Sequence, residues 1–238
     1  MPASSSNAGG TQRDSWSVER LCGLADARFS DVAGVSGFAR WMMRTRPRIC
    51  PLDWVLQAVP AGSRVLDIGC GRGLLVGLLS ATGRAVGGVG VDPSGPAVQT
   101  AAAMMSAEGD AWSWRTTARI EDWPDEAFDA VTMVDVMHHL PSAMRRPAVE
   151  AAAQRLKPGG VFVYKDMALR PWWSLMMNRL HDAALVREWT TPEPIDRVSG
   201  WAQATGLEQI DAKRGRRWWY THEQRTFRKP GNASGDAG

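Results

Sequence analysis

The sequence has 238 residues, of which 44% are hydrophobic and 22% are charged, and this composition excludes collagen-like, intrinsically disordered and disulfide-stapled chains. The apolar runs are too short to cross a bilayer, so we expect no membrane span. A net charge of +3 is too small to indicate nucleic acid as a partner, although it is compatible with an anionic small substrate or an acidic carrier protein.

The ends of the chain differ in composition from its middle. Residues 1–14 and 230–238 consist mainly of small and polar residues, which predict disordered tails on either side of a single domain at 15–229. The chain shows no basic segment followed by an apolar core near its start, so we expect no signal peptide. Its three widely spaced cysteines argue against a disulfide framework or a zinc site, and we expect a cytoplasmic location.

The domain is predicted to have four parts in chain order. A helical segment at 15–60 contains helices at 15–43, broken near Gly34 and Gly37, and at 51–59. A core at 61–168 alternates strands at 64–68, 85–91, 112–120, 130–134 and 161–165 with helices at 74–81, 95–108 and 142–156. An insertion at 169–198 is predicted to cover the site. The last part, 199–229, contains a helix at 199–205 and strands at 207–213 and 218–227, joined by a turn at 214–216. This alternation predicts a parallel sheet closed by a hairpin.

The most informative segment is the run from Val65 to Gly73, in which a buried strand ends, three glycines alternate through a turn and a helix follows. Glycine lets the backbone approach a ligand closely, and the helix N-terminus directs amides towards it. Asp92 ends the next strand about 20 residues later, where a carboxylate can accept both hydroxyls of a ribose.

The spacing of these glycines separates two kinds of ligand. A dinucleotide site would place its third glycine at position 74, which is Leu74. The sequence instead has an acid, Asp67, before the first glycine. A carboxylate there would repel a pyrophosphate and attract a cationic amino-acid group. S-adenosylmethionine carries an ammonium, a sulfonium and a ribose but no phosphate.

At this point the sequence resembles a known family. The run from Val65 to Gly73 is similar to motif I of the class I S-adenosylmethionine-dependent methyltransferases, and residues 128–131 and 156–160 follow in the order found in that family. The resemblance covers about residues 64–165. It implies a Rossmann-like fold, with a mostly parallel seven-stranded sheet, a C-terminal antiparallel hairpin and helices on both faces, and it implies S-adenosylmethionine as the cofactor.

The resemblance also implies roles for individual residues. Asp67 and Gly69 would lie against the methionine end of the cofactor, Gly71 and Gly73 would form the turn, and Asp92 would hold the ribose. The adenine contact departs from the family pattern because Arg119 stands where an acid is usual. Glu121 or Asp122 could replace it, with Ile120 or Trp123 against the ring, and packing is an equal interpretation of Trp123. The candidate cofactor-binding residues are Asp67, Gly69, Cys70, Gly71, Gly73, Asp92, Pro93, Ile120, Glu121 and Asp135.

The fourth predicted strand ends in a run that contains Asp135, His138 and His139, at the edge where parallel sheets bind ligands. Methyl transfer needs alignment of donor and acceptor, and a base adds to the rate. Histidine titrates in a useful range, so His138, His139 and His181 are the candidate bases. The alternative for His138 and His139 is that they pack or shape the pocket. Asp135 and Asp166 resemble part of a catechol-type metal site, but Met167 follows where a third ligand would be needed, so no metal is expected.

Substrate specificity is expected to come from regions outside the core. The helical segment with Phe38, Trp41, Met42 and Met43, and the insertion with its tryptophans and methionines, suit a large apolar acceptor, although packing is the alternative for most of these residues. The basic and aromatic stretch at 213–220 is interpreted as a hairpin rather than an RNA-binding patch.

We therefore expect a methyltransferase acting on a hydrophobic, aromatic or polyketide-like small molecule, free or bound to a carrier protein. Oxygen is favoured slightly over carbon as the methyl acceptor. The alternatives are an RNA or protein methyltransferase and a non-catalytic cofactor-binding protein. The oligomeric state is left open.

Overall fold

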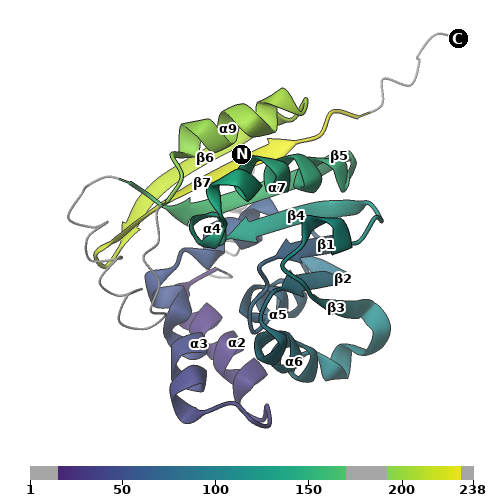
Figure 1. Ribbon diagram of the computed structural model, residues 1–238. Helices are drawn as coiled ribbons and strands as arrows, with labels where there is room; N and C mark the ends of the chain where they lie inside the picture. Colours follow the sequence, from purple (N-terminus) through teal and green to yellow (C-terminus); the bar gives the residue numbers. More distant parts are fainter. Residues whose placement is uncertain (1–15, 170–191, 232–238) are drawn as a thin grey trace, which may run out of the picture.

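The computed structural model describes residues 16–169 and 192–231. Within these residues, seven strands form a sheet in the order β3-β2-β1-β4-β5-β7-β6 (Figure 1). The strands are β1 (Ser63–Ile68), β2 (Ala85–Asp92), β3 (Trp112–Thr116), β4 (Phe128–Val134), β5 (Leu156–Met167), β6 (Glu208–Arg217) and β7 (Tyr220–Arg228).

The direction of the strands confirms the predicted fold class. Strands β1 to β5 pair in parallel, whereas β7 is antiparallel to both β5 and β6. The strand order reverses between β1 and β4, and open α/β sheets bind their ligands at the carboxyl ends of the strands beside such a reversal. The fold is thus the Rossmann-like, mostly parallel sheet with a C-terminal antiparallel hairpin.

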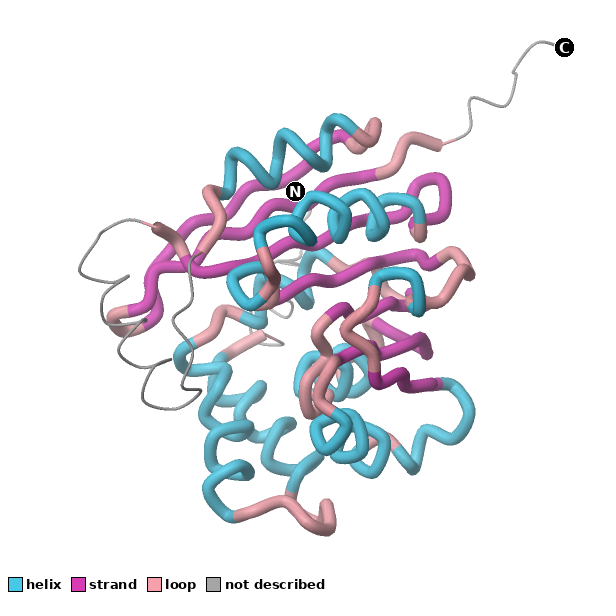
Figure 2. Tube along the Cα trace, viewed as in Figure 1, coloured by secondary structure: helices cyan, strands magenta, loops and turns pink. Residues whose placement is uncertain are grey.

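Helices cover both faces of the sheet (Figure 2). Because side chains alternate along a strand, Val65 of β1 joins a core with α2, α4 and α5, while Leu66 joins a core with α7 and α9. The helices are α2 (Val18–Phe29), α3 (Gly37–Ile49), α4 (Leu52–Ala58), α5 (Leu74–Ala81), α6 (Gly95–Met104), α7 (Ser142–Gln154) and α9 (Ile195–Ala204). None of the described helices has the length and apolar character that crossing a membrane requires.

The N-terminal helical segment divides where the glycines predicted it would. Gly34 has φ +76° between α2 and α3, and Ser36 begins α3 by accepting a hydrogen bond from the amide of Ala39 at 3.2 Å. Figure 1 shows α2 and α3, in purple, beside α5 and away from α7 and α9. The segment therefore extends the layer of helices that covers one face of the sheet.

Several element boundaries differ from the prediction. Strand β3 ends at Thr116 rather than at 120, and the helix expected at 95–108 gives way after Met104 to a 3-10 helix at Ser106–Ala111. Strand β5 begins at Leu156, which pairs with Phe128 of β4. The next pair is Ala130 with Val161, so residues 157–160 have no partner in β4. The residues predicted to stop α7 thus form a bulge at the start of β5.

The predicted turn at 214–216 is wrong. Residues 214–216 lie inside β6 and pair with residues 221–223 of β7. Gly215 pairs with His222, and the ring of Trp54 packs on its bare backbone, where a Cβ would lie 2.9 Å from the ring. The turn is at Trp218 and Trp219, and Trp218 has φ +54°. Gly215 thus serves a close contact with α4 rather than a turn.

Strand β2 depends on glycine for a steric reason. A Cβ at Gly88 would collide with the carbonyl oxygen of Val65 in the neighbouring strand. A Cβ at Gly90 would lie 2.5 Å from the ring of Trp114. A side chain at either position would therefore force a neighbouring residue to move.

Replacing Gly88 with Ala should lower the free energy of unfolding by about 3 kcal/mol or more, because backbone atoms of β1 would have to move. Urea denaturation measures the effect. The matched control is Gly200→Ala in α9, where a Cβ would have no neighbour within 4 Å, and which should stabilise by up to about 1 kcal/mol. Equal effects of the two substitutions would contradict the steric explanation.

Candidate active site

The loop between β1 and α5 contains three glycines with positive φ, at +74° for Gly69, +52° for Gly71 and +83° for Gly73. Gly69 faces the side chain of Val136 so closely that a Cβ would overlap it. A Cβ on Gly73 would lie 2.9 Å from the Cβ of Ala101 in α6. A Cβ on Gly71 would have no protein atom within 4 Å. Two of the glycines therefore permit packing, and the third leaves the loop open to a ligand.

Asp92 ends β2 and lies across this loop. Its Oδ2 accepts a hydrogen bond from the amide of Gly71 at 2.9 Å, and its Oδ1 accepts one from the amide of Ser94 at 2.8 Å. A carboxylate has about four acceptor positions, so both oxygens retain the capacity to accept further hydrogen bonds. Pro93, the next candidate residue, is exposed.

Asp67 lies beneath the loop and is 2% exposed. Its Oδ1 accepts a hydrogen bond from the hydroxyl of Thr132 at 2.6 Å. Burial raises the pKa of Asp67 to about 7, and Asp92 adds to the increase, although Thr132 opposes it. Cys70 is also buried, and burial raises the pKa of its thiol. The side chains of Asp67 and Cys70 are thus buried under the glycine loop.

The candidate adenine-binding residues follow β3. Ile120 is half-buried and Glu121 is exposed, and both belong to a short 3-10 helix at Ile120–Asp122. Asp122 accepts a hydrogen bond from Thr117 at 3.0 Å. Trp123 is 6% exposed and packs in the core beneath α7. The structure thus gives Trp123 a packing position and leaves Ile120 and Glu121 nearer the surface.

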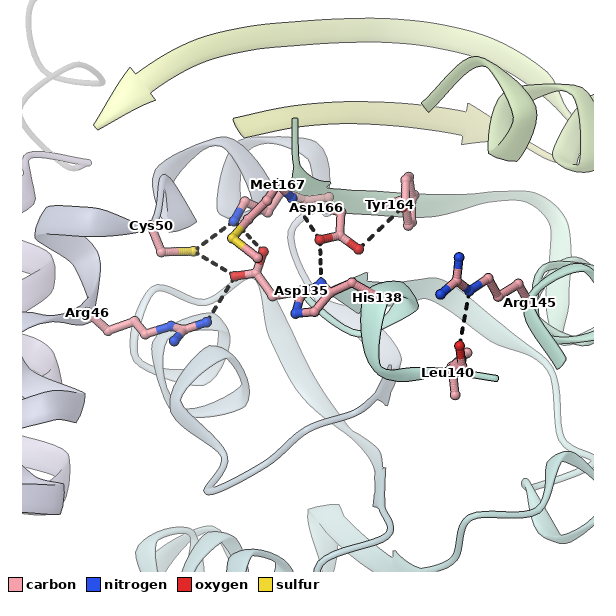
Figure 3. Close-up of polar contacts among 10 residues, drawn as sticks. Arg46, Cys50, Asp135, His138, Leu140, Arg145, Tyr164, Asp166 and Met167 are labelled. Carbon is pink, nitrogen blue, oxygen red and sulfur yellow. Dashed lines mark hydrogen bonds and ion pairs between the residues drawn. The ribbon is translucent and has the colours of Figure 1, made fainter. Parts of the chain in front are cut away.

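Asp135 comes directly after β4 and adopts φ +57°, which is rare for a residue other than glycine. Its amide donates to the carbonyl of Lys165 at 2.9 Å. Its Oδ1 accepts from Nζ of Lys165 at 2.7 Å, and its Oδ2 accepts from Nη2 of Arg46 at 2.9 Å (Figure 3). Burial alone would raise the pKa of Asp135, but the two cations hold it well below its usual value.

Lys165, Cys50 and His222 surround the carboxylate of Asp135. Lys165 is 0% exposed, and its Nζ lies 3.2 Å from Sγ of Cys50. Burial would lower the pKa of Lys165, but Asp135 raises it above the ordinary value. Burial raises the pKa of the Cys50 thiol. Burial and Lys165 lower the pKa of His222 to about 3. The charges near Asp135 at neutral pH are therefore Lys165 and Arg46, while Cys50 and His222 are neutral.

His138 lies in the 3-10 helix Met137–His139 that follows Asp135, and it is 6% exposed. Its Nδ1 lies 2.6 Å from Oδ1 of Asp166, which also accepts from the amide of Met167 at 2.7 Å. An ionised carboxylate only accepts hydrogen bonds, so Nδ1 is the donor in this contact. His139 is exposed, and its ring centroid is 4.1 Å from that of His138.

The structure brings most of the candidate residues to one edge of the sheet. The contact between Gly69 and Val136 joins the glycine loop to the turn at 135–139, and Asp92 joins it from the other side. His181 and nearly all of the predicted lid lie outside the described residues. The sequence interpretation did not single out Arg46, Lys165 or Thr132. The sequence did contain one signal for a buried charge in this region, because Lys165 directly follows the apolar run 161–164.

The two aspartates considered as metal ligands have different partners. Asp135 binds Lys165 and Arg46, whereas Asp166 binds His138. Across residues 16–169 and 192–231, no three His, Cys, Asp or Glu side chains are grouped as a metal site requires.

Comparisons with known proteins give the family. A family model described as a methyltransferase domain matches residues 42–229. The chain is 35% identical over 125 residues to a ubiquinone biosynthesis O-methyltransferase of Alkalilimnicola ehrlichii, a match that covers 50% of this chain and 49% of that protein. The chain thus spans about half the length of the curated relatives it matches.

Solved structures share the fold at low identity. An O-methyltransferase family protein from Burkholderia thailandensis has a TM-score of 0.64 at 19% identity, over 92% of this chain and 64% of that one. The magnesium protoporphyrin IX methyltransferase from Synechocystis, solved with bound S-adenosylhomocysteine, has a TM-score of 0.61 at 16% identity, over 92% of this chain and 94% of that one.

The raised pKa of Asp67 predicts a pH-dependent stability. The unfolded chain releases this proton near pH 4 and the folded chain near pH 7, so stability is lost as the pH rises between these values. Asp67→Asn can keep the hydrogen bond from Thr132, but it has no carboxyl group to ionise, so it does not lose stability between pH 4 and pH 7. The change that Asp67→Asn makes in the free energy of unfolding should therefore be more favourable at pH 8.5 than at pH 4, by up to about 4 kcal/mol. Urea denaturation at both pH values measures this. The control is Asp196→Asn, at a carboxylate whose side chain is 95% exposed, and an equal pH dependence in both variants would contradict the assignment.

Proposed function

The chain belongs to the class I S-adenosylmethionine-dependent methyltransferases, and we propose that it transfers a methyl group from this cofactor to a hydroxyl oxygen of an aromatic small molecule. The observation that supports a reaction with a hydroxyl group is the pair His138–Asp166 at 2.6 Å. His138 lies on the turn whose Val136 contacts Gly69 of the glycine loop, and Asp166 belongs to β5.

The loop fits the proposed cofactor. Gly71 faces open space, and the carboxylate of Asp92 is already fixed by two backbone amides, with acceptor capacity left for the ribose hydroxyls. Asp67 places a titratable carboxylate beneath the loop, near the expected position of the positively charged end of the cofactor. When bound, the cofactor supplies a methyl group on a sulfonium, which is already activated for displacement.

His138 is proposed as the base. Asp166 accepts a hydrogen bond from Nδ1–H of His138, which fixes the tautomer and orients the ring. Nε2 is then the atom that takes the proton of the acceptor hydroxyl while the oxygen forms its bond to the methyl carbon. Asp166 also stabilises the imidazolium that results. His139 is the alternative base on the same turn, and His181 stays a prediction because it lies outside the described residues.

The class of acceptor is proposed from two observations. The curated relatives are named as ubiquinone biosynthesis O-methyltransferases, which favours an aromatic hydroxyl. Phe38 and Trp41 of α3 stack at 6.0 Å and are exposed by 58% and 57%, so α3 presents an aromatic surface. The single domain at 15–229, the cytoplasmic location, a role in natural-product biosynthesis and a carrier protein as partner remain predictions.

The basic stretch at 213–220 gives little support to RNA as the acceptor. Arg217 binds Asp53 at 3.2 Å, Arg214 lies 3.6 Å from Glu223, and Lys213 donates to Gln57 at 3.0 Å. These cations already have partners within the protein, so an RNA backbone would have to compete for them.

Cofactor binding is tested by calorimetry with S-adenosylmethionine and S-adenosylhomocysteine. Gly71→Ala should weaken both by about tenfold or more, since the Cβ would enter the open side of the loop, where the cofactor is proposed to lie. Asp92→Asn should weaken both by a similar factor, because amide groups accept ribose hydroxyls less strongly than a carboxylate. The control is Gly109→Ala, where φ is +58° and no atom lies within 4 Å. Absence of binding by the unmodified chain would refute the proposed site.

The base is tested by methyl transfer to a panel of catechols and hydroquinones, followed by mass spectrometry for a gain of one methyl. His138→Gln should lower kcat by on the order of 10²–10⁴-fold with little change in cofactor affinity, and Asp166→Asn should lower it by a smaller factor. His139→Gln is the comparison. If His139→Gln were the more damaging substitution, the assignment of the base would move to that residue.

A further inference from the structure

We propose that Lys165 and Arg46 are positioning residues, which hold Asp135 in its left-handed conformation and so align the His138–Asp166 pair for proton transfer. The proposal rests on the proposed function and extends it to residues on the opposite face of the sheet. It also connects helix α3 to the turn that carries the base.

The first support is the way β5 holds both ends of one short turn. Lys165 and Asp166 are consecutive residues of β5, so their side chains lie on opposite faces of the sheet. Lys165 binds Asp135 at the start of the turn, and Asp166 binds His138 three residues later. Figure 3 shows Asp135 beside Arg46 and Cys50, and His138 beside Asp166. Movement at Asp135 therefore changes the direction in which His138 approaches Asp166.

The second support is the energetic cost of the arrangement. The left-handed conformation of Asp135 and the complete burial of Lys165 are both unfavourable on their own. A glycine at 135 beside an apolar residue at 165 would fold without either cost. Strained and buried polar arrangements of this kind persist mainly where function needs a fixed geometry.

The third support is the position of Arg46. It lies near the end of α3, and its guanidinium reaches Oδ2 of Asp135 while 40% of its side chain is exposed. Because Cys50 and His222 are neutral at pH 7, the cluster keeps the same charges over the working range. Arg46 thus provides a fixed link through which the position of α3 affects the turn.

The decisive variant is Asp135→Gly combined with Lys165→Met. It removes the strain and the buried charges together, so the chain should fold with a thermal midpoint at or above that of the unmodified protein. The Nδ1 proton of His138, observed by NMR without cofactor and assigned through its loss in His138→Gln, should lose its downfield shift or broaden. The kcat should fall by about ten- to a hundredfold, while the dissociation constants of both cofactor forms stay within about twofold.

The matched control is Asp129→Asn with Lys157→Met. This pair also joins β4 to β5, with Nζ and Oδ1 2.8 Å apart, but at the other edge of the sheet and with both side chains about 40% exposed. It should leave the His138 resonance and kcat unchanged. Arg46→Met should lower kcat by a smaller factor than the decisive variant.

Three outcomes would overturn the proposal. An unchanged His138 resonance with unchanged kcat would show that the turn needs no support from Lys165. A large loss of cofactor affinity would assign Asp135 to the cofactor site instead. Equal effects of the control pair would show a general response to changes between β4 and β5. The NMR measurement needs no turnover, so it tests the alignment of His138 even if the proposed reaction fails.

Discussion

The site depends on the contact between Gly69 and Val136. No side chain fits at position 69, because Val136 occupies that volume, so the loop after β1 and the turn after β4 meet directly. These two segments lie on the two sides of the point where the strand order reverses. One of them carries the groups that suit a nucleoside, and the other carries His138. A single missing Cβ therefore brings the proposed cofactor loop and the proposed base into one place.

The fold and the conformation of the glycine loop after β1 could be predicted because their signals are local. Glycines with an acid before them, an aspartate at the end of the next strand and apolar runs of strand length depend only on neighbours in sequence. The positive φ values of Gly69, Gly71 and Gly73 are of the same kind, since they follow from the loop itself. The alternation of strands and helices then restricts the topology strongly.

The rest could not be predicted because it depends on contacts between distant segments. The hairpin turns at Trp218 because β6 and β7 stay paired as far as Arg217 and Tyr220, and Gly215 within β6 packs against Trp54, 161 residues away in sequence. The pairing of Lys165 with Asp135 needs β4 beside β5, and the contact of Arg46 with Asp135 needs α3 folded over the strand end. The hydrogen bond between His138 and Asp166 likewise follows from the sheet register, which no local pattern of residues encodes.

Asp67 and Asp135 show how environment gives two buried carboxylates different properties. Asp67 has a neutral hydroxyl as its partner, so burial dominates and its pKa rises to about 7. Asp135 has two cations as partners, so it stays ionised and its charge is paired within the protein. Of these two carboxylates, Asp67 is therefore the one that changes its charge near neutral pH. The attraction of this edge of the sheet for a cationic ligand should increase as the pH rises through 7, while the support of the turn beside His138 stays constant.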